Sequence, residues 1–493
     1  MNATRNSVPP RSSRRFALDS AAGRLTPAER AERGKAARSA VPRDSHAGYD
    51  PAADRPDPVG LLERQAATRV PDLVPVRYGR MLASPFSYFR GAALSMAADH
   101  AATPVSGLAV QACGDAHLSN FGVYASPERA LVFDLNDFDE TLPGPWEWDV
   151  KRLAASLEVA GRGNGYRSGP RRKVVTATVG RYREAMRGFA GQGNLAVWYA
   201  RAETQVLREQ FVPQLAAREQ RQADSAVAKA RTRDSLQALA RLTRQVDGRP
   251  RIVADPPLLV PLSDLVADST DQATLETELR TLIGDYRRTL ETDRRYLLEQ
   301  LEFADMARKV VGVGSVGTRC WIVLMLGRDA SDPLFLQVKE AERSVLEDFA
   351  GNSEYANHGE RVVAGQRLMQ AASDIFLGWQ RTGVDPDGRP HDFYVRQLRD
   401  EKFSADIEAM TAAGMRAYGE LCGWTLARAH ARSGDRIAIA AYLGQSAVFD
   451  RAIAEFAAAY ADQNERDHQA LAAAVASGRL TASTEGSAPA NQH

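Results

Sequence analysis

The chain of 493 residues is too long for one small domain, so we expect at least two packed units. Hydrophobic residues make up 44% of it, which is enough to form a sizeable buried core. Lysine and arginine number 63 against 62 acidic residues, and this balance predicts no overall attraction to nucleic acid or to an anionic membrane surface.

Three scattered cysteines, Cys113, Cys320 and Cys422, show no metal-binding spacing and are typical of a reducing compartment. Ser13–Leu18 contains twin arginines, as a twin-arginine export signal does. Charged residues follow, however, where such a signal needs an apolar run, so we do not expect export. No run approaches the roughly 18 apolar residues of a membrane-spanning helix. We therefore expect a cytoplasmic protein that does not associate with a membrane.

Composition and periodicity divide the chain into five segments. Long helices are expected over Glu203–Arg244 and Asp271–Glu302, and a short helix near Pro27–Ala37. Residues 1–55 are expected to form a flexible tail, and residues 56–304 a helix-rich lobe with polar loops. Residues 305–403 are expected to form a smaller β-rich lobe. Residues 404–477 return as helices to the first lobe, and residues 478–493 form a disordered end.

The first polar loop is Gly114–Asn120, which follows the apolar strand expected over Gly107–Ala112. An aspartate such as Asp115 can accept the proton of an attacking hydroxyl, and the amide oxygen of Asn120 is a hard ligand suited to Mg²⁺. The alternative is an ordinary polar turn whose side chains cap the backbone.

A second polar loop, Asp134–Glu140, follows the strand expected over Ala130–Phe133. Carboxylates packed this densely repel one another unless a cation or basic ligand lies among them. A capped surface turn explains either loop alone, but two such loops at strand ends favour a metal and phosphate site. Just before them, Arg90 in the aromatic segment Ser84–Gly91 could contact a phosphate or an acidic partner, although core packing explains the aromatic residues.

A GxGxxG motif with Gly312, Gly314, Ser315 and Gly317 lies between two β-favouring runs, Val310–Val313 and Thr318–Leu326. Strand, turn, strand suits the glycine-rich loop of a kinase, because a dinucleotide fold needs a helix after the turn. The glycines let backbone amides approach phosphate oxygens.

Lys339 ends the next expected strand, Leu334–Lys339, and matches the lysine that pairs with nucleotide phosphates. The alternative is a solvated strand-edge lysine. A kinase-like lysine also needs an acid on a nearby helix. Glu347, Glu354 and Glu360 are the candidates, and Glu360 is favoured because it opens an expected helix, Glu360–Leu377.

The Gly-Asp-x-His-x-x-Asn motif resembles the catalytic loop of the aminoglycoside phosphotransferase and choline kinase branch of the protein-kinase-like superfamily. Asp137-Phe138-Asp139 is similar to the metal-binding segment of that branch. By this resemblance Asp115 would be the catalytic aspartate, Asn120 a metal ligand and Asp137 the main metal ligand. Asp149 would be a buried brace for the loop. Asp134 is a rival for the metal role, because it lies directly at the end of the expected strand. Cys113 stands where that branch usually has a histidine.

In an ordinary kinase the glycine-rich loop precedes the catalytic loop, but here it follows. We therefore expect an α+β, two-lobed, protein-kinase-like fold that is circularly permuted, with a β-rich lobe that clamps the nucleotide. Residues 75–470, roughly, also resemble a widespread bacterial family, domain of unknown function 2252, for which the resemblance brings no substrate.

We expect an ATP- and Mg²⁺-dependent phosphotransferase, or a nucleotidyltransferase built from the same parts, that acts on an unknown small molecule or protein. One alternative is a metal-dependent phosphohydrolase whose metals are held by the Gly-Asp-x-His motif, Asp137 and Asn352. Another is a nucleotide-binding module without turnover. The sequence does not indicate the acceptor or the oligomeric state.

Overall fold

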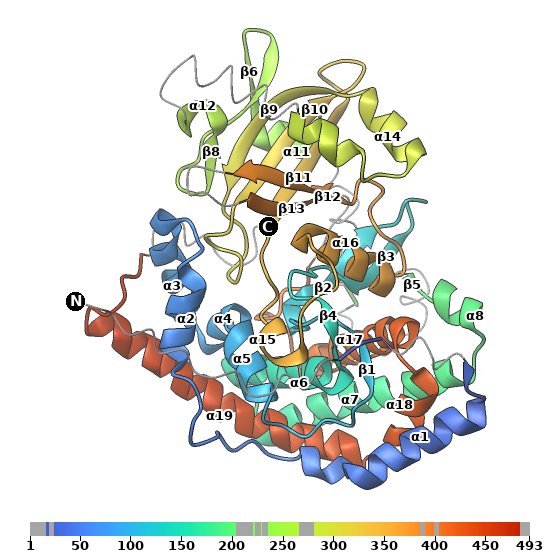
Figure 1. The fold of residues 1–493 in the computed structure, drawn as a ribbon. Helices are drawn as coiled ribbons and strands as arrows, with labels where there is room; N and C mark the ends of the chain where they lie inside the picture. The colour runs from blue at the N-terminus through green and yellow to red at the C-terminus, as the bar shows by residue number, and fades with distance from the viewer. Residues whose placement is uncertain are drawn as a thin grey trace.

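The protein is a mixed α+β molecule, as the sequence predicts, and its described residues form one large sheet and three small ones. The computed structural model describes residues 16–18, 24–203, 220–221, 228, 235–265, 281–384, 390–398 and 404–483. The large sheet lies at one end and most helices lie at the other, which we call the sheet region and the helical region (Figure 1).

The helical region draws its helices from both ends of the described chain. Helix α7 packs along α17, and α19 crosses both α6 and α7. The helices are α2 (Pro58–Ala66), α3 (Val74–Leu82), α4 (Pro85–Gly91), α5 (Ala93–His100), α6 (Trp146–Gly163), α7 (Ser168–Ala190), α17 (Ala412–Ser433), α18 (Arg436–Leu443) and α19 (Val448–Ala476).

Helix α6 is buried on all sides from Trp146 to Gly161, so it forms the centre of the largest core. Trp146 stacks on Tyr182 of α7, with ring centroids 5.8 Å apart. The polar residues that α6 carries are therefore buried as well, and each needs a partner inside the protein. Three of them, Asp149, Arg152 and Ser156, reach the first polar loop.

Two pairs of short strands place the polar loops side by side. β1 (Ala109–Ala112) pairs with β4 (Leu142–Pro145), and β2 (Phe121–Ala125) pairs with β3 (Leu131–Leu135), which also pairs with β5 (Ala202–Glu203). The first loop joins β1 to β2 through the short helix η4 (Leu118–Asn120), and the second joins β3 to β4. Because β1 lies against β4, the start of one loop lies beside the end of the other.

The sheet region is a six-stranded antiparallel sheet with the strand order β12-β13-β11-β10-β9-β8. Its strands are β8 (Leu259–Pro261), β9 (Glu302–Lys309), β10 (Cys320–Leu326), β11 (Pro333–Ala341), β12 (Gly378–Val384) and β13 (Pro390–Gln397). Helix α16 (His358–Met369) follows β11 in the chain and lies between the sheet and the small strands (Figure 1).

Side chains of the large sheet alternate between two apolar layers, as the two-residue period of a strand requires. Ile322 and Phe335 pack against α11 (Ser235–Leu242) on one face. On the other face Val323 and Leu336 pack near α14 (Thr292–Glu299). Lys339 is four residues after Phe335 on β11, so both side chains leave the strand on the same face. This is the face that α11 covers at Phe335.

Three expectations for the β-rich lobe need correction. Val310–Val313 is part of the turn, because β9 runs earlier, over Glu302–Lys309. The helix expected over Glu360–Leu377 ends at Met369, and β12 begins at Gly378. The sheet also begins before residue 305, because β8 and β9 lie within the stretch expected to be helical.

A hairpin replaces the last two residues of the long helix expected over Glu203–Arg244, which lies mostly outside the described residues. β6 (Thr243–Val246) pairs with β7 (Arg249–Ile252). Between them Asp247 and Gly248 have φ angles of 49° and 76°. Asp-Gly is a strong signal for a two-residue hairpin turn, because both positions must adopt positive φ. Of the helix expected over Asp271–Glu302, residues 281–287 and α14 are helical, residues 271–280 lie outside the described part, and Glu302 begins β9.

The tail expected over residues 1–55 is folded from residue 24 onward; residues 1–15 and 19–23 lie outside the described part. Helix α1 (Pro27–Ala40) starts with a capping box and packs on α18. At Gly34 an added Cβ would lie 2.0 Å from the carbonyl oxygen of Ala438, so the two helices touch through their backbones. His46 is buried, with its Nε2 2.7 Å from the hydroxyl of Tyr442.

The remaining short elements are η2 (Arg43–His46), η3 (Pro71–Leu73), α8 (Asn194–Tyr199), α12 (Leu262–Leu265) and α15 (Glu347–Ala350). All three cysteines are buried and form no disulfide. Across the described ranges, no helix is long and apolar enough to cross a membrane. The disordered end expected over residues 478–493 is described only as far as residue 483.

Candidate active site

The first polar loop is held by a buried carboxylate. Asp149 of α6 accepts hydrogen bonds from the backbone N–H groups of Cys113, at 2.7 Å, and Gly114, at 2.9 Å. Nε2 of His430 lies 3.0 Å from the same carboxylate, and its Nδ1 lies 2.9 Å from the hydroxyl of Tyr182. The expectation that Asp149 braces the loop is confirmed, and His430 supports it from α17.

Asp115 is the acid of this loop, and its side chain is 23% exposed. Its Oδ1 accepts hydrogen bonds from the buried Arg152, whose Nη2 lies 2.7 Å away. Its Oδ2 lies 3.7 Å from Nε2 of His117. Burial lowers the pKa of His117 to about 4, so that imidazole is neutral at pH 7 and does not neutralise the carboxylate. Arg152 thus fixes one oxygen of Asp115, while the other accepts no hydrogen bond from the described residues.

Asn120 is buried, and its side-chain amide is oriented by two backbone carbonyls. Nδ2 donates to the carbonyl oxygens of Asp115, at 3.1 Å, and Asp137, at 2.9 Å. These bonds fix which end of the amide is the nitrogen. Oδ1 is buried and has no hydrogen-bond partner among the described residues. An unpaired buried acceptor costs about 1–3 kcal/mol, so this oxygen is suited to a ligand such as a cation.

The two polar loops touch at Gly114. This residue has a φ of +84°, and an added Cβ would lie 2.4 Å from the carbonyl oxygen of Glu140. Both the positive φ and the close contact require glycine. Glu140 also accepts a hydrogen bond of 2.7 Å from the backbone N–H of Val345, and burial raises the pKa of Glu140 to about 7. The second loop therefore connects the first loop to the segment that follows β11.

Lys339 brings the sheet region to the second loop. Its Nζ lies 3.4 Å from both carboxylate oxygens of Asp137, which is 202 positions earlier in the chain. It also forms a short ion pair with Asp139. Asp139 in turn accepts a hydrogen bond of 2.8 Å from the hydroxyl of Tyr394 on β13. The alternative of a solvated edge lysine does not hold, because Lys339 is buried.

The charges of this cluster depend on one another. Burial lowers the pKa of Lys339, but the carboxylates of Asp137 and Asp139 outweigh it and raise this pKa well above its ordinary value. Burial raises the pKa of Asp137, but Lys339 and Arg396 outweigh it and hold this pKa at about 2. For Asp139, burial and the neighbouring Asp137 raise the pKa. Two carboxylates share one ammonium, so the cluster has an acid that stays ionised beside one that takes up a proton more readily.

Asp134, the rival metal ligand, is already occupied. It is fully buried and forms an ion pair with Arg428 of α17. It also accepts hydrogen bonds from the backbone N–H groups of Ala371, at 2.8 Å, and Leu135, at 2.9 Å. These bonds join β3 to α17 and to the end of α16. Asp134 therefore supports the structure, whereas Asp137, which is also paired with Lys339, is 42% exposed and open to solvent.

The glycine-rich loop joins β9 to β10, as the sequence predicts, and contacts the helical region. Arg80 donates a hydrogen bond of 2.6 Å to the carbonyl oxygen of Gly312, and Arg69 donates to that of Val316. A trans peptide points its N–H opposite to its C=O. The N–H groups of the following residues, Val313 and Gly317, therefore point away from these arginines. The sequence indicated the loop but not the arginines that hold it.

Glu360 lies at the start of α16, as expected, but the structure does not bring it to Lys339. Its carboxylate instead helps to raise the pKa of Tyr355, although burial and the carboxylate of Glu354 contribute more to that shift. The next residue, Arg361, is the one that enters the site: it donates hydrogen bonds of 2.7 Å to the carbonyl oxygens of Asp139 and Thr141. Glu347 is also turned elsewhere, since it accepts from the backbone N–H groups of Ser344 and Ser353.

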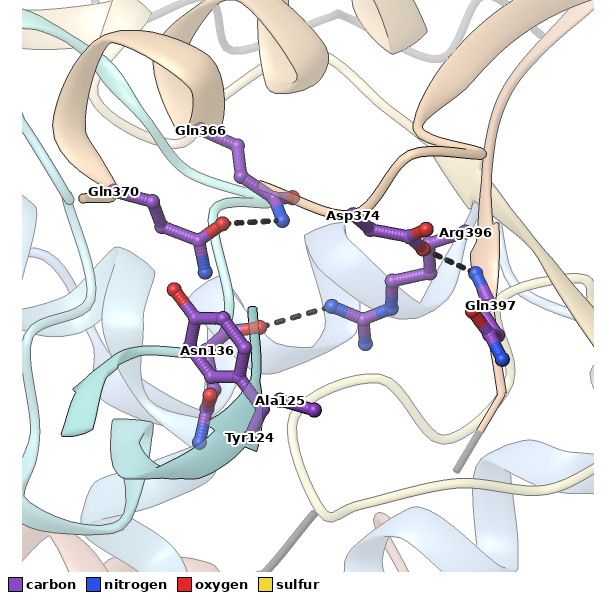
Figure 2. A pocket seen from close by; sticks show the side chains of 8 residues that line it. All are labelled: Tyr124, Ala125, Asn136, Gln366, Gln370, Asp374, Arg396 and Gln397. Carbon is purple, nitrogen blue, oxygen red and sulfur yellow. Dashed lines mark hydrogen bonds between the residues drawn. The ribbon is translucent and has the colours of Figure 1, made fainter. Parts of the chain in front are cut away.

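A small polar hollow lies behind Asp137, where β13, α16 and the ends of β2 and β3 meet. Arg396 crosses it, with Nη1 donating a hydrogen bond of 2.9 Å to the carbonyl oxygen of Asn136 (Figure 2). Nε of Arg396 donates to Gln337 on β11, at 2.9 Å. The hollow has a volume of about 20 Å³, which is room for about one water and not for a nucleotide. It is lined by Tyr124, Ala125, Asn136, Gln366, Gln370, Asp374, Arg396 and Gln397.

A magnesium ion would have few protein ligands here. Within the described ranges, no group of three or more His, Cys, Asp or Glu side chains could hold a metal. Magnesium usually keeps several waters and binds through one or two carboxylates plus substrate phosphates. The free amide oxygen of Asn120 and the ionised carboxylate of Asp137 fit this requirement.

The sequence profile of one bacterial protein family matches residues 69–474, which is well over half of the chain. The chain belongs to this family, described as uncharacterized proteins conserved in bacteria (DUF2252). No curated protein and no solved structure matches the chain. Every residue of the candidate site, from Arg69 to His430, lies within the matched range.

Proposed function

We propose that this family member is an ATP- and Mg²⁺-dependent phosphotransferase that acts on a small molecule or a protein. The site that supports this is assembled from four parts: a partly exposed aspartate on a braced loop, an amide and a carboxylate suited to magnesium, a glycine-rich loop and a buried lysine. Phosphoryl transfer needs little covalent chemistry from the protein, so positioning and charge stabilisation are what such a site must supply.

The observation that carries the proposal is the contact between Lys339 and Asp137. A structural ion pair could join any two parts of the fold. This one joins the strand after a glycine-rich hairpin to an acidic loop beside Asp115, and those are the parts that a kinase-like site combines. In such sites the lysine binds nucleotide phosphates and the aspartate binds the metal that bridges them.

The order of elements in the sheet region also favours a kinase-like fold. The glycine-rich loop joins β9 to β10, Lys339 lies on β11, and α16 comes before β12 and β13. In protein kinases the lysine likewise lies on the strand that follows the glycine-rich hairpin, and a helix comes after it. The catalytic loop precedes all of these elements here, so we propose a circular permutation in which the β-rich lobe is inserted between two halves of the helix-rich lobe.

The roles of the residues follow from their contacts. Asp115, fixed through one oxygen by Arg152, is placed to orient an acceptor hydroxyl and take its proton. Asn120 and Asp137 would hold Mg²⁺, which when bound neutralises charge on the phosphates. Backbone amides of the glycine-rich loop and the ammonium of Lys339 would bind phosphate oxygens. A nucleotidyltransferase could use the same residues with the nucleotide reversed.

The hydrolase alternative is less well supported. It relies on Asn352 as a metal ligand together with the first polar loop and Asp137. Asn352 is exposed and accepts a hydrogen bond of 3.2 Å from Arg343. His117 faces Asp115 through Nε2, and only its buried Nδ1 lacks a partner in the described part of the chain. A two-metal hydrolase also leaves Lys339 and the glycine-rich loop without a role.

The substitution Asp115→Asn tests the proposal, because it keeps the shape of the side chain and removes its basicity. ADP formation from Mg²⁺·ATP is measured with a panel of hydroxyl-bearing small molecules and a protein acceptor. We expect turnover to fall about 10²- to 10⁴-fold while nucleotide affinity stays within about twofold. Asp72→Asn, at an exposed acid of η3, is the control.

Equal turnover in wild type and Asp115→Asn would contradict the assigned role of Asp115. Nucleotide binding without any turnover in the wild type would instead indicate a binding module, the third class of function that the sequence leaves open.

A further inference from the structure

Arg90, at the end of α4, lies where the first polar loop and the glycine-rich loop meet. Its carbonyl oxygen is 3.1 Å from the position that a Cβ on Gly314 would occupy. The preceding residue, Phe89, accepts a hydrogen bond of 2.8 Å from Arg152, which also holds Asp115. The end of α4 therefore contacts the glycine-rich loop at Gly314 on one side and Arg152, which holds Asp115, on the other.

The guanidinium of Arg90 differs from those of the neighbouring arginines. Arg69, Arg80 and Arg152 each donate to a carbonyl oxygen or a carboxylate. For Arg90, Nε is buried without a hydrogen-bond partner, and no nitrogen of its side chain forms a hydrogen bond or ion pair within the described ranges. Leaving the buried N–H donor on Nε unpaired is costly unless a ligand takes it up, and a ligand that reaches it also meets the Nη donors of the same guanidinium.

The charges around Arg90 place it at the reactive end of the proposed site. Burial lowers its pKa, and the carboxylates of Asp115 and Glu408 oppose that effect. Arg90 in turn contributes to the lowered pKa of His117, beside Asp115. Lys339 is held at the other loop, by Asp137 and Asp139. The two cations are therefore associated with different carboxylates of one site.

Building on the proposed function, we propose that Arg90 binds the terminal phosphoryl group of the nucleoside triphosphate, between Gly314 and Asp115. The transferred group must lie next to the hydroxyl that Asp115 orients and beneath the loop that covers the phosphates. Arg90 is the unpaired cation at that position, and the planar fork of its guanidinium matches phosphate oxygens. Lys339 would then bind the inner phosphates, which a nucleoside diphosphate also has.

Titration calorimetry on the full chain tests this assignment with two nucleotides that differ by one phosphoryl group. The probes are Mg²⁺·ADP and the Mg²⁺ complex of a triphosphate with a non-hydrolysable β,γ-imido bridge. We expect Arg90→Gln to weaken triphosphate binding tenfold or more and ADP binding less than twofold. Arg90→Lys keeps the charge without the fork, so it should recover part of the lost triphosphate affinity.

Arg80→Gln is the matched comparison, because Arg80 holds the glycine-rich loop through Gly312 and should affect both nucleotides equally. Thermal melting shows whether each variant is folded. If Arg90→Gln weakens both nucleotides equally, or neither, the assignment is wrong while the proposed function stands. If the folded wild type binds neither nucleotide, the proposed function fails and the role of Arg90 fails with it.

Discussion

The two halves of the candidate site are anchored differently. In the helical region each aspartate is held by a side chain from a helix of that region. Arg152 holds Asp115, Arg428 holds Asp134 and His430 holds Asp149. In the sheet region the glycine-rich loop and Lys339 are held by residues of the other region. Arg80 and Arg69 bind carbonyls of the loop, and Asp137 and Asp139 bind the lysine.

This difference separates folding from binding. The supports of the first half are deeply buried ion pairs and hydrogen bonds, so their loss should reduce global stability. The contacts of the second half cross between regions and end on groups that a nucleotide would also contact. Their loss should reduce nucleotide affinity more than stability. Three substitutions test this contrast.

The largest effect on stability is expected for Asp149→Ala. This change leaves the buried N–H groups of Cys113 and Gly114 and the imidazole of His430 without their acceptor. We expect the free energy of unfolding to fall by about 3–5 kcal/mol, measured by urea denaturation. Asp72→Ala, at an exposed acid, should change it by less than about 0.5 kcal/mol. A loss below about 1 kcal/mol would mean that Asp149 does not brace the loop.

A smaller, pH-dependent effect is expected for Glu140→Gln, at the contact between the two halves. Burial raises the pKa of Glu140 from 4.5 to about 7. The folded state therefore binds the proton more tightly, so this group stabilises most below about pH 4.5 and loses that contribution as pH rises through 7. Wild type should lose up to about 3 kcal/mol between pH 5 and pH 8 relative to Glu140→Gln.

Urea denaturation at both pH values measures the difference, and Glu299→Gln, at an exposed site, is the control. A stability difference between wild type and Glu140→Gln that is the same at pH 5 and pH 8 would rule out a buried, titrating carboxyl here.

The smallest effect on stability, with a clear effect on binding, is expected for Lys339→Met. Methionine keeps much of the volume of the side chain but removes the ammonium. The remaining carboxylates of Asp137 and Asp139 are 42% and 27% exposed, so solvent can reach them. We expect ATP affinity to fall tenfold or more in calorimetry, with a smaller loss of stability than in Asp149→Ala.

Lys173→Met, at an exposed position of α7, is the control for Lys339→Met. Unchanged ATP affinity in Lys339→Met would place the nucleotide elsewhere and break the distinction between the two halves.

Local sequence patterns predicted the parts of the site but not their partners. The polar loops at strand ends, the glycine-rich hairpin and Lys339 each have a local signature. Asp134 has the same kind of local surroundings as Asp137, and only the distant Arg428 shows that Asp134 is already paired. In the same way, helix α16 was predictable, but tertiary packing turns Arg361 and not Glu360 into the site.

The fold was predicted in its class and in its main strands and helices, with errors where long-range packing decides. Helix α1 is folded because Gly34 fits against Ala438 far along the chain, and composition alone indicated a tail. The hairpin at Asp247 and Gly248 is different, because its turn signal was present in the sequence and the surrounding helical pattern obscured it.

The central claim is that this chain binds a nucleoside triphosphate together with magnesium. Titration calorimetry of the full wild-type chain with ATP, with and without Mg²⁺, tests it most directly. We predict saturable binding to one site, tightened by Mg²⁺, because Asn120 and Asp137 would hold the cation against the phosphates. No binding in either condition would contradict the account.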